Sequence, residues 1–253
     1  FNTAIQAATS EDNFVEFILA GQPEPPLYFA NMKRDNKVGP RVLSDLPLPP
    51  RMRADDLRAI DGRKAAIIDT RPWDAFREGH VPNALSIGLT KNFNSDAGSF
   101  LQDTDPIYLI IAPEQVEFAV RQLIRVGLDR IEGWFDANEL NQFESAATPL
   151  VSTPCIAATE ADALAESSHV HVLDVRRATE FADGHIPGAT NVAHTRLAAR
   201  LDELPRDKHL LVNCHSGVRS ARSCAFLERM GYQVTNLDGG IVAWSELHAE
   251  TNR

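Results

Sequence analysis

Cysteine is scarce in this chain of 253 residues, and long apolar runs and a surplus of basic side chains are both lacking. Three cysteines, an odd number, do not make a disulfide framework, so we expect a reducing, cytoplasmic compartment. The longest apolar run, 107–112, is far shorter than the roughly 20 residues of a membrane span. Acidic side chains number 35 against 25 basic ones, and the net charge of −10 argues against nucleic-acid binding. These absences favour a soluble globular protein with neither a membrane nor a nucleic-acid partner.

One segment of the chain occurs twice. Residues 67–84 and 172–189 align without a gap at an offset of 105 residues, and each copy contains an Asp-x-Arg triplet and a Gly-His-x-Pro turn. A period of domain size indicates a tandem duplication and not a solenoid. The matched residues are Asp69 and Asp174, Arg71 and Arg176, and His80 and His185.

Each copy alternates short, unbroken apolar runs with helical stretches. This pattern is typical of parallel strands buried on both faces, so the fold class is α/β, with two tandem domains, each a small parallel sheet flanked by helices. Proline-rich stretches divide the chain into an N-terminal extension (1–45), a first domain (46–150) and a second domain (151–253). The expected strands are 65–68, 107–111, 169–173, 210–212 and 233–237.

The N-terminal extension matches neither copy. Ser10 is a candidate N-cap for a helix that ends at Gly21, with Phe14, Phe17 and Ile18 on one face. Because so short a segment cannot bury these side chains alone, we expect them to pack on the repeats, a partner chain or a further domain.

The second copy contains a candidate nucleophile, Cys214. It follows the expected strand 210–212 at its carboxyl end, where open α/β sheets bind their ligands. A helix should begin within a few residues, and its exposed amides and dipole would stabilise a thiolate, the reactive form of cysteine. We therefore expect Cys214 to be catalytic; an inert core thiol is the alternative, but the neighbouring residues are too polar for a core position.

The residues after Cys214 form a candidate cradle. Gly217 lets the backbone turn its amides inward, and Arg219 offers a charge suited to an oxyanion. His215 and Ser216 need not react, because their amides alone can line the cradle. We expect Arg219 to act with the cysteine in catalysis, and the substrate-binding residues to be His215, Ser216, Gly217, Val218 and Ser220.

Other candidate groups have simpler interpretations. Cys224 lies among small and apolar residues of the expected helix, and core packing is favoured there and for Cys155 over a resolving thiol. His185 and Asp174-x-Arg176 recur in the first copy, which favours a structural turn and an ion pair over catalysis. The pair His169-x-His171 has no nearby third ligand, so no metal site is expected.

The first copy lacks the nucleophile. Ala112 stands where Cys214 would, and the stretch from Ala112 to Gly127 spans 15 residues, whereas that from Cys214 to Gly231 spans 17. Pro113 removes an amide donor and Glu114 adds a negative charge. We expect this copy to give structural support or to form a wall of a cleft between the domains.

Taken together, these residues resemble the rhodanese (sulfurtransferase) family over about 52–250. The motifs are 174–176, 184–189, 214–219 and 237–240 with Trp244. The resemblance implies that Cys214 accepts a sulfane sulfur from thiosulfate or a persulfide such as glutathione persulfide, and that the loop amides hold it. Cyanide, sulfite or a thiol would then remove it, and no cofactor is implied for this chain.

The extension is similar to the tail of a metallo-β-lactamase-fold domain in fusions with tandem rhodaneses, on the residues 14–17, 22–29, Asn36 and 39–40. Those fusions resemble persulfide dioxygenases, in which the upstream domain would bind iron. Because the chain begins at Phe1 without methionine, we expect it to be the C-terminal part of such a fusion. No H-x-H-x-D-H motif occurs in it, so iron is expected only in the missing domain.

Two other functions fit parts of this pattern. Cysteine phosphatases and arsenate reductases use a C-x5-R loop, whereas Cys214 and Arg219 form C-x4-R, a smaller cradle that suits a single sulfur better than a phosphate. The second alternative is a non-catalytic scaffold, or a module that presents a persulfide to a partner. The intact loop argues against it, whereas the inactive first copy and the unpaired aromatics favour it.

Overall fold

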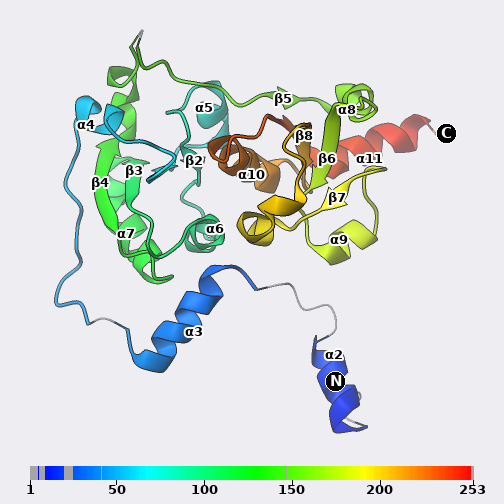
Figure 1. Ribbon diagram of the computed structural model, residues 1–253, viewed down its shortest axis with the longest axis horizontal. Helices are drawn as coiled ribbons and strands as arrows, with labels where there is room; N and C mark the ends of the chain where they lie inside the picture. Colours follow the sequence, from blue (N-terminus) through cyan, green and yellow to red (C-terminus); the bar gives the residue numbers. More distant parts are fainter. Residues whose placement is uncertain (1–4, 6–8, 20–24, 41, 146, 252–253) are drawn as a thin grey trace.

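Two parallel sheets form the body of the protein in a computed structural model that describes residues 5, 9–19, 25–40, 42–145 and 147–251 (Figure 1). Helices flank each sheet, so the predicted class of two α/β units is confirmed. All pairings between the named strands are parallel, as expected of strands linked through helices.

The first sheet has the order β2-β1-β3-β4. Its inner strands are almost wholly buried, which explains their unbroken apolar sequences. The strands are β1 (Ala66–Asp69), β2 (Leu85–Ser86), β3 (Ile107–Ile111) and β4 (Ile131–Asp136). The helices are α4 (Ala54–Arg58), α5 (Trp73–Glu78), α6 (Phe93–Phe100), η1 (Pro113–Gln115), α7 (Val116–Ile124) and η2 (Ala137–Gln142).

The second sheet has the order β5-β9-β8-β6-β7, so β8 lies in its centre. The five expected strands of the two sheets agree with observed strands to within one residue at each end, whereas the strands 85–86, 131–136, 155–156 and 190–191 were not predicted. The strands are β5 (Cys155–Ile156), β6 (Val170–Asp174), β7 (Thr190–Asn191), β8 (His209–Asn213) and β9 (Val234–Leu237). The helices are α8 (Ala158–Ala165), α9 (Ala178–Ala182), η3 (His194–Ala199), η4 (Leu201–Glu203), α10 (Val218–Arg229) and α11 (Gly240–Thr251).

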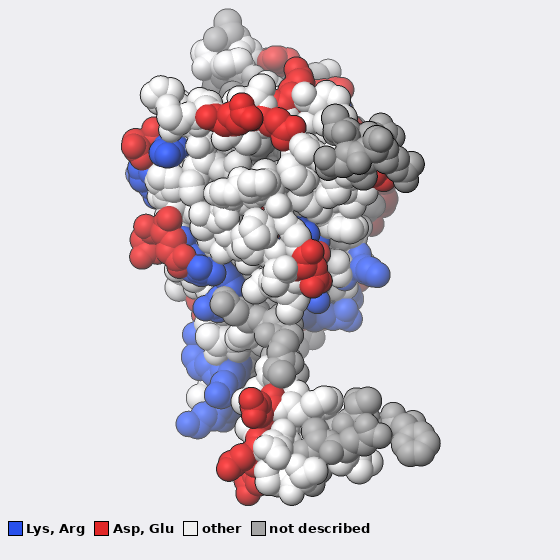
Figure 2. Space-filling view, turned by 90° about the vertical axis from the view of Figure 1, so that its right-hand side faces the viewer, with Lys and Arg blue, Asp and Glu red and all other residues white. Residues whose placement is uncertain are grey.

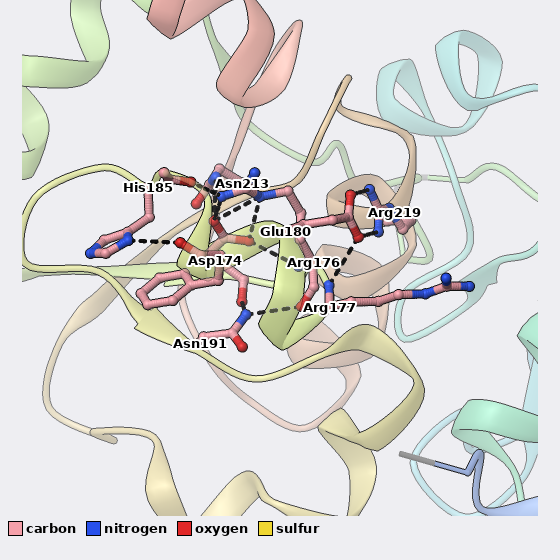
Figure 3. Close-up of polar contacts among 10 residues, drawn as sticks. Asp174, Arg176, Arg177, Glu180, His185, Asn191, Asn213 and Arg219 are labelled. Atoms are coloured by element: carbon pink, nitrogen blue, oxygen red, sulfur yellow. Dashed lines mark hydrogen bonds and ion pairs between the residues drawn. The ribbon is translucent and has the colours of Figure 1, made fainter. Parts of the chain in front are cut away.

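The repeated Asp-x-Arg triplet forms the same buried ion pair in both units, and this pair is called the latch below. The guanidinium of Arg176 donates to both carboxylate oxygens of Asp174 and to the carbonyl of Gly184, which closes the turn after β6 (Figure 3). In the first unit Arg71 makes the same bonds to Asp69 and to the carbonyl of Gly79. The predicted ion pair is therefore present in both copies.

The repeated histidine has a structural role in each turn. Nδ1 of His185 lies 2.9 Å from the carbonyl oxygen of Phe181, and the two rings stack 3.8 Å apart. His80 stacks on Phe76 at 3.9 Å, with the corresponding contact at 2.8 Å. These contacts confirm the structural interpretation of the Gly-His-x-Pro turn.

Helix α10 joins the two units into one core. It lies between the two sheets in Figure 1, and buried residues of both units belong to the same hydrophobic cluster. Phe226 of α10 stacks on Phe100 of α6 with 5.0 Å between ring centroids. Arg229 donates from Nε to the carbonyl of Gly62, and Arg222 pairs with Asp96 at 3.1 Å. The position of the helix that follows Cys214 is therefore set partly by the first unit.

The extension contributes two helices, α2 (Glu11–Leu19) and α3 (Tyr28–Val38). Ser10 caps α2 as predicted, because its Oγ accepts from the Asn13 amide at 3.1 Å. The ring of Tyr28 lies so close to Gly98 that a Cβ there would meet it at 2.6 Å. Phe14 and Phe17 are 39% and 43% exposed. The predicted stop at Gly21 lies outside the described residues.

The helices within the described ranges lack the features of a membrane span. None of them combines the length and the apolar character that crossing a membrane requires. The longest helices of the two units, α10 and α11, have 12 residues each.

Replacing Phe100 by alanine should destabilise the whole protein, because it removes a ring that is 4% exposed from the contact between the units. We expect a loss of about 3 to 5 kcal/mol in the free energy of unfolding, measured by urea titration. Phe118 is 48% exposed, and Phe118→Ala is the matched control with a loss below about 1 kcal/mol. Similar losses for the two variants would contradict the shared core.

Glu228 of α10 should make stability depend on pH. Burial raises the pKa of Glu228 from 4.5 to about 7, although Thr153 Oγ1 donates to its carboxylate at 2.8 Å. Because the folded pKa is the higher one, folding is penalised progressively as pH rises from 4.5 through 7, by up to about 3 kcal/mol. Glu228→Gln should therefore stabilise the protein at pH 8 but not at pH 4, in urea titrations at both values. Glu166→Gln, at an exposed position, is the control; an equal effect of Glu228→Gln at both pH values would contradict this reading.

Candidate active site

Cys214 lies directly after β8, in the middle of the second sheet. Its side chain is 1% exposed, and α10 begins four residues later at Val218. Gly217 precedes this helix with φ +89°, a conformation that side chains with a Cβ rarely adopt. The expected arrangement of strand, tight loop and helix N-terminus is therefore present around the thiol.

Hydrogen bonds from the start of α11 orient the loop. The amide of Ile241 donates to the carbonyl of Cys214 at 2.8 Å, and that of Val242 donates to the carbonyl of His215 at 3.2 Å. In a trans peptide the N–H points opposite to the C=O, so the amides of His215 and Ser216 point away from α11. Within the described chain, no group accepts a hydrogen bond from the amides of residues 215–218. These unsatisfied donors are suited to an electron-rich sulfur or oxygen atom.

Close packing leaves no space for a side chain where the loop meets α11. A Cβ on Gly240, whose φ is +60°, would lie 2.5 Å from the carbonyl oxygen of Cys214. The same Cβ would lie 2.7 Å from the carbonyl oxygen of His215. Glycine at this position is therefore required for the bonds that orient the loop.

Ser220 is the polar side chain that the structure places at the thiol. Its Oγ is buried and lies 3.4 Å from Sγ of Cys214 and 3.1 Å from the carbonyl oxygen of Gly217. The hydroxyl can donate to a thiolate at Sγ. The side chains of His215 and Ser216 are exposed, as is that of Val218 at 54%, so these residues offer their backbone to the loop.

Arg219 forms an ion pair with a carboxylate in this structure, and its catalytic role stays a prediction. Its two terminal nitrogens donate to the two carboxylate oxygens of Glu180 at 2.7 Å each (Figure 3). These bonds lower the pKa of Glu180 to about 2 and raise that of Arg219 above its usual value. The pair is therefore ionised at any physiological pH, and its charges compensate each other.

Sequence reasoning missed Glu180. A comparison of the copies could have found it, because Ala75 stands at the matching position of the copy that lacks the cysteine. The other arginine near the loop, Arg176, is likewise compensated by Asp174. Asn213 donates to that carboxylate from Nδ2 at 3.3 Å and so connects the latch to the residue before the thiol (Figure 3).

The other cysteines differ from Cys214. Cys224 is fully buried in α10, and burial raises the pKa of its thiol well above the usual value, which makes it a core residue as predicted. Cys155 is half-buried on the edge strand β5, and burial also raises its pKa. The described residues contain no cluster of three or more His, Cys, Asp or Glu side chains placed to hold a metal ion.

The first unit has no equivalent site. Ala112 follows the matching strand β3 and precedes the 3₁₀ turn η1, which has Pro113 at its first position. Glu114 is exposed in this turn. The missing thiol, the missing amide and the shorter loop are all consistent with the predicted loss of function in this copy.

Comparison with known proteins agrees with this geometry. The model of the Rhodanese-like domain matches twice, at residues 53–130 and 157–247. A Sulfurtransferase of Allochromatium vinosum is 40% identical over 83 residues, which are 32% of this chain and 78% of that protein. Thiosulfate sulfurtransferase GlpE of Shewanella oneidensis is 34% identical over 87 residues, 34% of this chain and 86% of that protein.

Solved structures include similar proteins. A Rhodanese-like domain protein from Staphylococcus aureus is 32% identical over 36% of this chain and 91% of its own, with a TM-score of 0.35. The two family matches, one on each unit, together span more than half of the sequence. The chain therefore belongs to the rhodanese-like family, a family with sulfurtransferases among its members.

Proposed function

We propose that this protein is a sulfurtransferase that moves a sulfane sulfur from a donor to a thiophilic acceptor through a persulfide on Cys214. The observation that carries the proposal is the loop around the buried thiol, in which the amides of residues 215–218 have no acceptor among the described residues. These donors, with Ser220 Oγ, can stabilise the terminal sulfur of a Cys214 persulfide.

The first step loads the sulfur. The Cys214 thiolate attacks the sulfane sulfur of a persulfide R–S–SH, forming a new S–S bond while the donor's S–S bond breaks and R–S⁻ leaves with the bonding electrons. With thiosulfate the leaving group is sulfite. In both cases the sulfane sulfur moves between sulfur atoms, so no external oxidant or reductant is required.

The second step unloads the sulfur and restores the thiolate. A nucleophile such as cyanide, sulfite or a thiolate attacks the terminal sulfur, and the S–S bond on Cys214 breaks. The reaction needs a free thiol, and Cys155, Cys214 and Cys224 are all free. A thiol that must stay free is suited to a reducing compartment such as the cytoplasm, and neither step uses a cofactor in this chain. Fusion to an upstream iron-binding domain stays a prediction.

Charge compensation supports a persulfide as the preferred donor over thiosulfate. Arg176 and Arg219 both make two bonds to a carboxylate, so neither adds an uncompensated positive charge beside the cradle. Thiosulfate carries two negative charges and loses hydration on entry, which requires charge compensation. The sulfur of a persulfide carries one charge at most, and neutral amides suffice for it.

The same pair argues against phosphatase or arsenate reductase activity. Such a site needs an arginine free to bind a tetrahedral oxyanion in two places, whereas both terminal nitrogens of Arg219 are bonded to Glu180. A parallel assay with p-nitrophenyl phosphate should therefore show no turnover. If the protein were a scaffold that only presents a persulfide, sulfur would load on Cys214 but no acceptor would be turned over.

Cys214→Ser should abolish sulfur transfer, because a hydroxyl is a far weaker nucleophile and cannot hold a persulfide. Mass spectrometry after incubation with glutathione persulfide should show one added sulfur on the Cys214 peptide of the parent protein. Cys155→Ser is the matched control and should load normally. Transfer that persists in Cys214→Ser would assign the nucleophile elsewhere.

Glu180→Gln should change the choice of donor, because it leaves Arg219 charged but uncompensated. We expect KM for thiosulfate to fall about tenfold, the effect of one charge-assisted contact, while kcat with glutathione persulfide stays within about twofold. Steady-state assays of both donors measure this difference. Glu166→Gln makes the same charge change at an exposed site and should alter neither. Equal effects of Glu180→Gln on both donors would show that the ion pair of Glu180 and Arg219 does not select the donor.

A further inference from the structure

A cavity of about 730 Å³ lies where the two units meet, next to the candidate active site. The second unit contributes α9, η3 and the start of α10, and the first unit contributes α6. Its volume is in the range of small-molecule sites. We propose that this cavity binds the anionic body of a small thiol whose sulfur reacts at Cys214, an inference that rests on the proposed sulfurtransferase function.

The cavity has a positive lining in a protein whose net charge is −10. Two of its arginines are compensated by acidic residues of the same lining, Arg219 by Glu180 and Arg222 by Asp96. Arg177 differs, because the described part of the chain contains no carboxylate paired with its guanidinium. Figure 3 shows its side chain extending past the pair of Glu180 and Arg219.

The segregation of charge is visible on the surface. In Figure 2 the Lys and Arg side chains gather on the lower half of the main body, above α2. Helix α9, which follows Arg177, lies on this lower side in Figure 1. The charge that bears on the cavity is that of its own lining, in which basic side chains outnumber acidic ones. An anionic ligand would be attracted to such a lining, since fields of one sign raise the local concentration of the opposite charge.

His194 adds a buried ring nitrogen, Nδ1, that has no hydrogen-bond partner in the described structure. Burial, with the positive charges of Arg219 and Arg222, lowers the pKa of His194 to about 4, so the ring is neutral at pH 7. A neutral ring facing cationic neighbours is suited to a hydrogen bond from a ligand that also brings negative charge.

Arg219 connects the cavity to the reaction site. It is the second residue of α10, directly after the loop that begins at Cys214, and its side chain also lines the cavity. An extended peptide of three residues spans about 10 Å, which is comparable with the width of a cavity of about 730 Å³, so a ligand the size of glutathione suits it. Arginine binds both carboxylates and phosphates well. The feature shared by the ligands that fit this cavity is therefore a thiol that carries an anionic group of either kind.

The first unit supplies part of this site although it lacks a nucleophile. Asn92 and Ser95 of its helix α6 and the turn before it line the cavity, and Asp96 holds Arg222 in place. The retained function of the first copy is therefore to form one wall of a binding site for the second.

Binding can be measured apart from transfer with ligands that cannot react. Calorimetry on Cys214→Ser would compare S-methylglutathione, which carries carboxylates, and S-methyl coenzyme A, which carries phosphates, with neutral N-acetyl-S-methylcysteamine. We expect at least one anionic ligand to bind and the neutral one not to bind. The stronger of the two anionic ligands identifies whether carboxylates or phosphates are recognised.

Arg177→Gln in the same background should weaken the anionic ligand about tenfold, the effect of one charge-assisted contact. Arg177 is exposed, so its loss should not unfold the protein. Arg125→Gln removes an exposed arginine outside the cavity and is the matched control. Unchanged affinity in Arg177→Gln, or equal losses in both variants, would overturn the proposed site.

Asn92→Asp tests the contribution of the first unit. Asn92 is exposed at the N-cap of α6, where an aspartate is well tolerated, and the added charge should weaken anionic ligands several-fold. If these ligands bind as predicted while the parent protein transfers no sulfur, the proposed function fails and the site remains. If transfer is observed but no anionic ligand binds, the site fails and the function remains.

Discussion

Two backbone hydrogen bonds, from the first amides of α11 to the carbonyls of Cys214 and His215, determine how the loop at the thiol is used. Because each peptide unit is planar and trans, carbonyls held on one side place the following amides on the other. Gly240 permits this approach, since any Cβ there would collide with the same carbonyls. The hydrogen-bond donors of the cradle are thus backbone amides oriented by these two bonds. The side chains of the loop face solvent or the core.

The charged side chains around this loop form ion pairs with one another. Asp174 with Arg176 is buried and fixes the turn after β6, and Glu180 with Arg219 lies where that turn meets α10. Buried charges need partners of opposite sign, and each pair satisfies its own members before a ligand arrives. The selectivity of such a site depends on the charges left unpaired, and in the neighbouring cavity Arg177 has no carboxylate partner among the described residues.

The two units of the duplication have different roles. Both retain the Asp-x-Arg latch and the histidine stacked in the turn, because these hold the fold of each unit. The first unit has no thiol, yet it packs against α10 through Phe100 and lines the cavity through α6. An inactive copy can thus remain necessary, since it positions the helix that begins at the active loop.

The sequence by itself determined the duplicated α/β fold, five of the nine strands of the described chain to within a residue, and the place of Cys214 at a strand end, because these follow from local apolar patterns and from the repeat. The strands β2, β4, β5 and β7 were not predicted. Only the tertiary structure decided that Glu180 neutralises Arg219, that α10 joins the two units, and that a cavity lies between them. Glu180 and Arg219 are 39 positions apart. The repeat distinguishes Glu180 from Ala75 of the first copy, but the sequence does not say which arginine that carboxylate meets. Such pairings depend on how helices pack on the sheets.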